Sequence, residues 1–160
     1  MSADGSVTAV RERRGPGLFA LLARLLLGAV FVAMGWAKAS DPVAFLKLLR
    51  EYQMVPAENP WLLNGLAAVL PWFEIVCGTA LLLGLWRRGA ALLVALMLVG
   101  FSYVVWDRAR GVAADDDLSF CAVAFDCGCG GGVVNICRKL AENAGLFVLA
   151  LVTLVVRPRR

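Results

Sequence analysis

The sequence of 160 residues contains no histidine, few charged residues and only two tyrosines. Without histidine, the chain lacks the commonest general base and metal ligand of proteins. Charged residues make up 18% of the chain and hydrophobic residues 61%, well above the roughly 45–50% of ordinary soluble domains. So few charges could not cover this much apolar surface in water. The composition therefore predicts a membrane protein.

Several function classes lack their sequence signatures. No phosphate-binding glycine motif follows a strand pattern, and no nucleophile elbow is present. The net charge of +4 is explained by arginines beside apolar segments, so nucleic-acid binding is not indicated. No repeat, low-complexity tract or second domain is visible. We therefore treat residues 1–160 as a single membrane domain.

Four apolar segments predict membrane-spanning helices, since about 20 apolar residues cross a bilayer. They cover residues 17–37, 61–86, 90–106 and 134–156, and the last is the weakest because its charge-free part runs only from Ala144 to Val156. The apolar runs do not alternate with a period of two, so barrel strands are not expected. We predict an all-α fold, a polytopic four-helix membrane bundle.

Arginine clusters set the predicted orientation, because basic residues beside membrane helices stay in the cytoplasm. These clusters are Arg11, Arg13 and Arg14, then Arg87 and Arg88, and finally Arg157, Arg159 and Arg160. Both termini, including the tail of residues 1–15, are then cytoplasmic, and the chain lies in the inner membrane. Residues 44–54 fit a helix lying on the outer interface. A cleaved signal peptide is the alternative for the N-terminus, but its apolar core would span only roughly 7–15 residues.

Four of the five cysteines lie in the Cys/Gly-rich outer loop between the third and fourth helices: Cys121, Cys127, Cys129 and Cys137. On that side of the membrane disulfides form and persist. Cys127 and Cys129 could bond each other only in a tight turn, which the neighbouring glycines permit. Such a bond would be strained and suited to exchange. Pairing with Cys121 or Cys137 is the alternative, and four cysteines allow three pairings.

Charge separates these cysteines into two kinds. Cys137 lies near the start of the fourth helix beside Arg138 and Lys139, and a helix N-terminus and cations both favour a thiolate. Asp126 opposes a thiolate at Cys127. We therefore expect redox exchange between an attacking and a resolving thiol. A structural staple and a thiolate metal site are the alternatives, although zinc favours C-x₂₋₄-C pairs.

Glu74 is predicted in the middle of the second helix. An ionisable group at that depth is expensive and indicates function by default. Arg24, in the first helix, is the basic candidate to pair with it, and we name both as candidate cofactor-binding residues. The alternative is that Arg24 reaches the inner interface and Glu74 is protonated or bonded within the bundle. Cys77 is expected to be an inert buried thiol.

An ordered set of residues resembles the MauE/DoxX family of redox-associated membrane proteins. The set is Arg24, Gly28, Gly35, Lys38, Asp41 and Pro42, then Pro71, Glu74 and Gly78, and finally Asp126, Cys127, Gly128 and Cys129. The resemblance implies a four-helix membrane protein with Cys127 and Cys129 as redox positions. MauE members are associated with disulfide formation in an exported partner, and DoxX relatives with sulfur redox and quinone-linked electron transfer.

The expected function is thus thiol–disulfide or sulfur exchange outside the cytoplasmic membrane, the reaction of a thiol–disulfide oxidoreductase. The expected partners are the bilayer and an exported thiol, disulfide or sulfur-carrier protein, and a quinone is a candidate electron acceptor by resemblance alone. Two alternatives stay open. One is a non-enzymatic membrane module that holds metal or sulfur through the cysteines, and the other is a small transporter built around Glu74.

Overall fold

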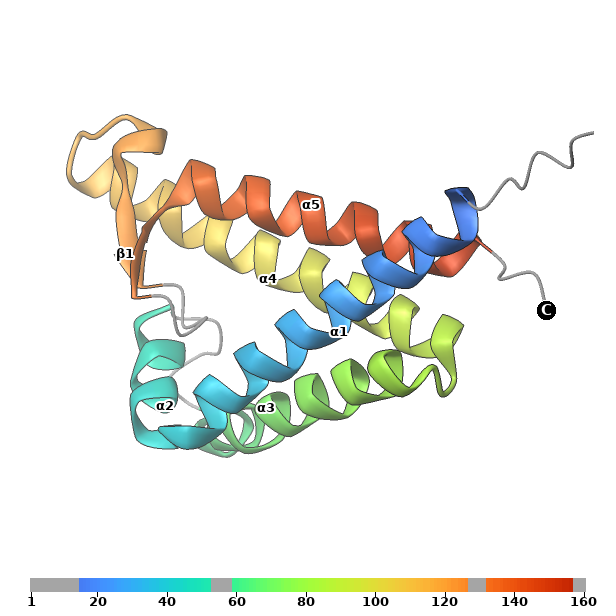
Figure 1. The fold of residues 1–160 in the computed structure, drawn as a ribbon. Helices are drawn as coiled ribbons and strands as arrows, with labels where there is room; N and C mark the ends of the chain where they lie inside the picture. The colour runs from blue at the N-terminus through green and yellow to red at the C-terminus, as the bar shows by residue number, and fades with distance from the viewer. Residues whose placement is uncertain (1–14, 53–58, 127–131, 157–160) are drawn as a thin grey trace, which may run out of the picture.

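The computed structural model describes residues 15–52, 59–126 and 132–156 (Figure 1). The elements in chain order are α1 (Gly15–Ser40), α2 (Pro42–Glu51), α3 (Pro60–Leu83), α4 (Arg87–Asp115), the 3-10 helix η1 (Phe120–Ala122), β1 (Ala124–Asp126), β2 (Val133–Asn135) and α5 (Ile136–Val155). The described part of the chain is therefore mostly helical, as predicted.

Three helices are long and apolar enough to cross a membrane, over Gly17–Ser40, Pro60–Leu83 and Arg87–Asp115. Large apolar side chains project from all three, for example Leu22, Val69 and Leu96, and lipid tails solvate such side chains as well as another helix would. The chain is a membrane protein. Helix α5 is not among the three, because Arg138, Lys139 and Glu142 lie in its first two turns.

Helices α1 and α3 pack against each other at glycines. A Cβ atom added to Gly28 would lie 2.8 Å from the carbonyl oxygen of Gly78, and one added to Gly78 would lie 2.8 Å from that of Gly28. A Cβ on Gly35 would lie 2.7 Å from the carbonyl oxygen of Pro71. Small residues allow membrane helices to approach this closely. These glycines thus set the distance between the two helices.

The buried core joins α1 and α3 to α4 and α5. Its fully buried side chains include Phe31 of α1, Leu81 of α3 and Leu98 of α4, and Ala150 of α5 completes it. Helix α4 packs most extensively on α5, as α1 does on α3. A second small cluster, centred on Val123 and Ile136, packs the β1–β2 hairpin on α4.

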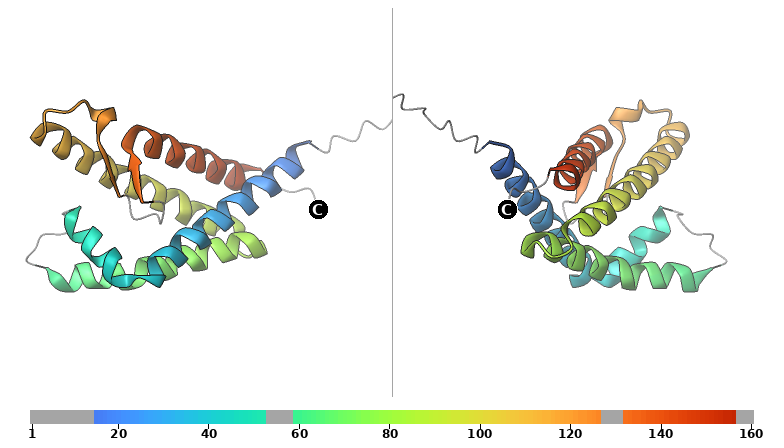
Figure 2. Two further views of the ribbon diagram at one scale, coloured as in Figure 1. Left: turned by 60° about the vertical axis from the view of Figure 1, so that its left-hand side comes forward. Right: turned by 90° about the vertical axis from the view of Figure 1, so that its right-hand side faces the viewer.

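The bundle has two different ends, visible in Figure 1 and in both views of Figure 2. The start of α1, the turn between α3 and α4 and the end of α5 lie at one end. Helix α2 and the β1–β2 hairpin lie at the other, which we call the hairpin end. This arrangement keeps the hairpin away from the start of α1 and the end of α5.

Several predicted boundaries differ from the structure. The helix expected over residues 134–156 begins only at Ile136, because Val133–Asn135 pairs antiparallel with Ala124–Asp126. The fold is therefore mostly helical and also contains a short two-stranded hairpin. The helix expected over 90–106 runs from Arg87 to Asp115, since its polar last turns continue beyond the apolar segment. The helix expected over 61–86 ends at Leu83, where Gly84 adopts a left-handed φ of 75°.

The helix expected over residues 44–54 corresponds to α2, which starts two residues earlier. Asp41 caps it, its side chain accepting a hydrogen bond from the backbone nitrogen of Ala44 at 2.9 Å. Pro42 follows at the first helical position, where its fixed φ suits a helix start. The α2 segment is therefore anchored directly to the end of α1.

Candidate functional site

A disulfide joins Cys121 and Cys137 at the hairpin end. Cys121 belongs to η1 and Cys137 to the first turn of α5, and their Cα atoms are 5.2 Å apart, within the usual range of about 4.4–6.8 Å. The sequence leaves three pairings open for the four loop cysteines. The structure brings these two together, one on each side of the hairpin.

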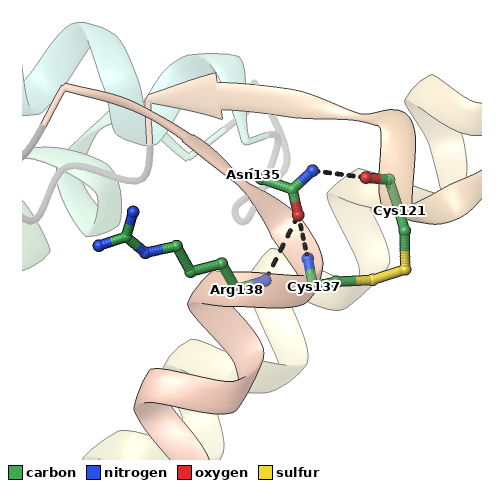
Figure 3. Close-up of a disulfide and its surroundings, with 4 residues drawn as sticks. All are labelled: Cys121, Asn135, Cys137 and Arg138. Carbon is green, nitrogen blue, oxygen red and sulfur yellow. Dashed lines mark hydrogen bonds between the residues drawn. A yellow bond between two sulfur atoms is a disulfide. The ribbon is translucent and has the colours of Figure 1, made fainter.

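Asn135 holds both halves of this disulfide in place (Figure 3). Its side-chain oxygen accepts hydrogen bonds from the backbone nitrogens of Cys137 at 3.0 Å and Arg138 at 3.4 Å, which caps α5. Its side-chain nitrogen donates to the backbone carbonyl of Cys121. One amide therefore fixes the backbone on each side of the sulfur–sulfur bond.

The two cysteines differ in exposure and in electrostatic setting. Cys121 is exposed and Cys137 is partly buried. Cys137 lies in the first turn of α5, next to Arg138, and α5 has no acidic residue in that turn. The positive end of the helix dipole would stabilise a thiolate on Cys137, whereas the Arg138 side chain points away from the disulfide (Figure 3) and pairs with Glu142. Cys121 lies in the short 3-10 helix η1 and not at the N-terminus of an α-helix.

Cys127 and Cys129 lie outside the described residues, in the segment that connects β1 to β2. The strands that flank this segment are described. Asp126, directly before Cys127, pairs with Val133 at the end of the ladder. The redox roles predicted for Cys127 and Cys129 therefore stay predictions.

Tyr52 ties α2 to the hairpin. Its hydroxyl donates a hydrogen bond to the backbone carbonyl of Asp126 at 3.1 Å. Its ring meets that of Phe125 edge-on, with centroids 5.5 Å apart. Burial raises the pKa of the Tyr52 phenol, and the negative charge of Asp126 adds to this effect. The phenol is thus held protonated, as a donor needs to be.

Lys38, and not Arg24, is the partner of Glu74. The Lys38 ammonium donates to both carboxylate oxygens, at 2.8 and 2.6 Å, and the two residues are 4% and 0% exposed. Arg24 precedes Lys38 by 14 residues on α1, which is about 21 Å along a helix. The expectation that Arg24 pairs with Glu74 is wrong, because α1 continues past Ala37 and carries Lys38 into the bundle.

Aromatic rings surround this ion pair. The Lys38 ammonium lies 5.3 Å from the ring centre of Phe101 and 5.8 Å from that of Phe45, distances at which a cation is attracted to a ring face. Beside it is an open pocket of about 130 Å³, also lined by Asp41 and Asp126. The pocket connects the ion pair with the end of β1.

This pocket does not fit the quinone suggested by the DoxX resemblance. A quinone ring offers two carbonyl oxygens, and each needs a hydrogen-bond donor in a buried site. Among the residues that line the pocket, the buried donor is the Lys38 ammonium, and two of its three N–H groups already bond the oxygens of Glu74, which leaves one donor for two carbonyl oxygens. A quinone is therefore not assigned to this pocket.

Two residues of this region are missed by sequence reasoning. Lys38 ends an apolar run, which places it in the predicted outer loop, although the run could extend by one helical turn. Asn135 stands directly before α5, and an asparagine at that position is a recognisable N-cap signal. Cys77 is a free, buried thiol of α3, as expected.

Comparison with known families identifies the chain. Residues 16–156 match the family described as Methylamine utilisation protein MauE, which covers nearly all of the residues that form helices and the hairpin. Comparison with curated proteins and with solved structures gave no match. The residues that carry the resemblance in the sequence include Gly28, Gly78, Lys38 and Glu74, which meet between α1 and α3. The chain is therefore a membrane protein of the MauE family.

Proposed function

We propose that this protein exchanges disulfides with an exported partner at the hairpin end of the bundle. The observation that carries the proposal is the asymmetric Cys121–Cys137 disulfide, with Cys121 exposed and Cys137 in the first turn of α5. An incoming thiolate attacks the sulfur that it can reach, and the better-stabilised thiolate leaves. Accessibility therefore selects Cys121 as the sulfur that is attacked, and thiolate stability selects Cys137 as the leaving group.

The exchange begins at Cys121. A partner thiolate forms a bond to the Cys121 sulfur, the Cys121–Cys137 bond breaks, and Cys137 leaves as a thiolate. A second partner thiol, after losing its proton, then attacks the mixed disulfide at the partner's own sulfur and releases Cys121. The partner loses two electrons and becomes a disulfide, while the chain gains two electrons and becomes a dithiol. The same steps in reverse reduce a partner disulfide.

Cys127 and Cys129 are proposed as the second thiol pair, on the strength of the family resemblance. They follow β1 in the chain, while Cys121 precedes it. Exchange between the two pairs would pass a disulfide along the hairpin without any net change in the number of disulfides. Lys38 and Glu74 would act as positioning residues for the hairpin end, since their ion pair joins α1 to α3 next to α2.

The proposed location is the cytoplasmic membrane, with the hairpin end outside and α5 as the fourth span of a single membrane domain. Arg87 and Arg88 mark the opposite end of the bundle, and basic residues favour the cytoplasm. An even number of spans would place both termini on that side. Disulfide chemistry at the hairpin end then takes place where disulfides persist.

The test is a redox titration followed by trapping. A disulfide that only staples the loop should have a potential below about −300 mV, whereas an exchanging disulfide lies higher. We expect the Cys121–Cys137 couple to equilibrate in a glutathione buffer, as measured by mass spectrometry of alkylated protein. We expect Cys137→Ser to accumulate a mixed disulfide on Cys121, and Cys77→Ser to behave as wild type.

Two results would contradict the proposal. The first is a disulfide that resists a strongly reducing glutathione buffer in the folded protein, which would assign it a structural role. The second is the absence of any mixed disulfide in Cys137→Ser and in the corresponding single variants of Cys121, Cys127 and Cys129. Stoichiometric metal that is lost with Cys127 and Cys129 would instead support a binding module.

A further inference from the structure

A small cationic pocket lies at the end of the bundle opposite the disulfide. It has a volume of about 80 Å³ and is formed by α1, α4 and α5, with Arg24, Arg87, Gly17 and Thr153 among its lining residues. The disulfide exchange proposed above does not use it. We propose that this pocket binds the phosphate group of a phospholipid headgroup.

Arg24 has a buried hydrogen-bond donor that needs an acceptor. Its Nε atom is buried and has no hydrogen-bond acceptor among the described residues. Its guanidinium lies against Gly84, where an added Cβ would come 2.5 Å from Nη1. The C-terminus of α3 favours a cation there, which accounts for the position but leaves Nε unbonded. A buried unsatisfied donor is rare and points to an ion or water that completes it.

The start of α4 points to an anion independently. Trp86 precedes it with a left-handed φ of 45°, makes no side-chain cap, and no acidic residue occurs in the first turn. Arg87 and Arg88 stand there instead, where the helix dipole repels cations. An anion at this helix start would accept from free backbone N–H groups and offset the charge of Arg87, which lines the pocket, whereas Arg88 does not line it.

The described part of the chain supplies no carboxylate for this purpose. None of the residues that line the pocket is acidic. Glu74 is bonded to Lys38, and Thr153 uses its hydroxyl proton for the carbonyl of Leu149 at 2.9 Å. Two guanidinium groups from different helices suit a tetrahedral oxyanion, because arginine binds phosphate through several parallel hydrogen bonds.

The surroundings favour a lipid as the source of the phosphate. The pocket lies at the end of the bundle where α1 and α4 begin and α5 ends, and basic residues at the ends of membrane helices face the lipid headgroups. Leu18, Leu21 and Leu22 project from α1 beside it and are 57%, 42% and 55% exposed. Acyl chains could lie along this apolar face while the phosphate enters the pocket.

The experiment uses the full chain in a neutral detergent without phosphate. We titrate it with phosphatidylglycerol, with diacylglycerol of the same acyl chains, and with inorganic phosphate, and follow the melting midpoint and native mass spectra. We expect phosphatidylglycerol alone to bind and to raise the midpoint. Arg87→Gln should weaken this binding about tenfold, as for one lost charge-assisted contact. Arg88→Gln is the matched control and should not.

Four outcomes would overturn the proposal. Equal stabilisation by inorganic phosphate would indicate a site for a soluble anion, and equal stabilisation by diacylglycerol would indicate acyl-chain binding. An equal loss of affinity in Arg88→Gln would indicate attraction by net charge alone. Asp4 and Glu12 lie outside the described residues, and tighter lipid binding by Glu12→Gln would assign the pocket to that carboxylate. Arg24→Gln should also weaken the binding of phosphatidylglycerol, and Arg87→Gln keeps the test valid if that variant fails to fold.

Discussion

Gly28 of α1 and Gly78 of α3 face each other so closely that a Cβ on either would lie 2.8 Å from the other's carbonyl oxygen. Both belong to the residue set that resembles the MauE family. Along the same contact, Gly35 lies against Pro71 and Glu74, and Lys38 reaches the Glu74 carboxylate one turn later. The glycines therefore create the close approach that lets this ion pair form.

Alanine at Gly28 or Gly78 should destabilise the protein. Each added methyl group would force α1 and α3 apart, and overpacking of this kind costs about 1–3 kcal/mol. The melting midpoint in detergent measures the effect. A Cβ added to Gly100 of α4 would meet no atom within 4 Å, so Gly100→Ala is the matched control. Alanine has a higher helix propensity than glycine, so Gly100→Ala should not destabilise the protein, and an equal loss in that variant would show that the contact between α1 and α3 is not responsible.

Removing one partner of the Lys38–Glu74 pair should cost more than removing both. A single buried charge left without its partner costs about 3–5 kcal/mol, so Lys38→Met and Glu74→Gln should each be strongly destabilising. The double variant leaves no unpaired charge and should lose less stability than either single variant. A double-mutant cycle of unfolding free energies measures this coupling, and simple additivity would refute it.

The exposed pair of Arg138 and Glu142 supplies the control for that cycle. Their side chains are 78% and 44% exposed, and the distance from Arg138 Nε to Glu142 Oε1 is 2.9 Å. Pairs of this kind on a helix surface contribute about 0.3–0.5 kcal/mol. A coupling between Lys38 and Glu74 no larger than this would mean that solvent reaches the buried pair.

Asn135 should control both the stability of α5 and the chemistry of the disulfide. Asn135→Ala loses the cap, at a cost of about 1 kcal/mol, and should speed reduction by dithiothreitol. Asn135→Asp keeps the acceptor for Cys137 and Arg138 but places a negative charge beside Cys137. It should therefore keep the cap of α5, lose the hydrogen bond to the Cys121 carbonyl and disfavour the thiolate form of the reduced Cys137. Equal alkylation rates of Cys137 in Asn135→Asp and wild type would contradict this assignment.

The membrane character and the long helices could be predicted from the sequence because apolar runs of sufficient length have one physical solution in lipid. The partner of Glu74 could not. A lysine at the end of an apolar run looks like a loop residue, and only the packing of α1 on α3 shows that Lys38 turns inward. The ladder of Ala124–Asp126 with Val133–Asn135 is too short to leave an alternating pattern.

The cysteine pairing could not be predicted from the sequence for a related reason. Spacing alone allows Cys137 to bond any of the other loop cysteines. The choice of Cys121 depends on η1 and the start of α5 lying side by side, which the buried contacts of Val123 and Ile136 produce. The backbone nitrogen of Ile136 also donates to the carbonyl of Val123 at 3.2 Å. Long-range packing, which no local pattern encodes, selects the pair.

Tyr52 should titrate above the usual tyrosine value of about 10. Burial raises the pKa of its phenol, and the charge of Asp126 raises it further. The chain has two tyrosines, so Tyr103→Phe leaves Tyr52 as the single tyrosine whose ionisation changes the ultraviolet absorbance. Asp126→Asn should bring the midpoint down. A midpoint at the ordinary value in the folded protein would show that the Tyr52 hydroxyl is solvated.

The raised pKa of Tyr52 also makes the free energy of unfolding depend on pH in the alkaline range. In the unfolded chain the phenol ionises near pH 10, whereas in the folded protein it keeps its proton to higher pH. The contribution of Tyr52 to the free energy of unfolding is therefore complete below about pH 10 and is lost as the pH rises toward the folded value. Tyr52→Phe should lack this alkaline component, as measured by denaturant unfolding at about pH 8 and about pH 11, on either side of the unfolded value.

Single cysteines introduced at exposed positions should report the orientation of the bundle. In a chain whose native cysteines are replaced by serine, Gly111→Cys lies near the end of α4 at the hairpin end, and Arg88→Cys lies at its start. A membrane-impermeant maleimide should label the first in intact spheroplasts and the second only after lysis. The reverse pattern would place the hairpin in the cytoplasm and remove the compartment that the proposed exchange needs.

The same labelling assay tests whether α5 crosses the membrane, and this sets the number of spans. Val155, its last residue, is 74% exposed, and Arg138, Lys139 and Glu142 lie near its start. If α5 crosses the membrane, those residues lie at the outer headgroups, where the exposed side chains of Arg138 and Glu142 can reach water. Val155→Cys would then be protected in spheroplasts and labelled after lysis, like Arg88→Cys. Labelling of Val155→Cys in intact spheroplasts would make α5 a helix that does not cross, and the chain would have three spans with its termini on opposite sides.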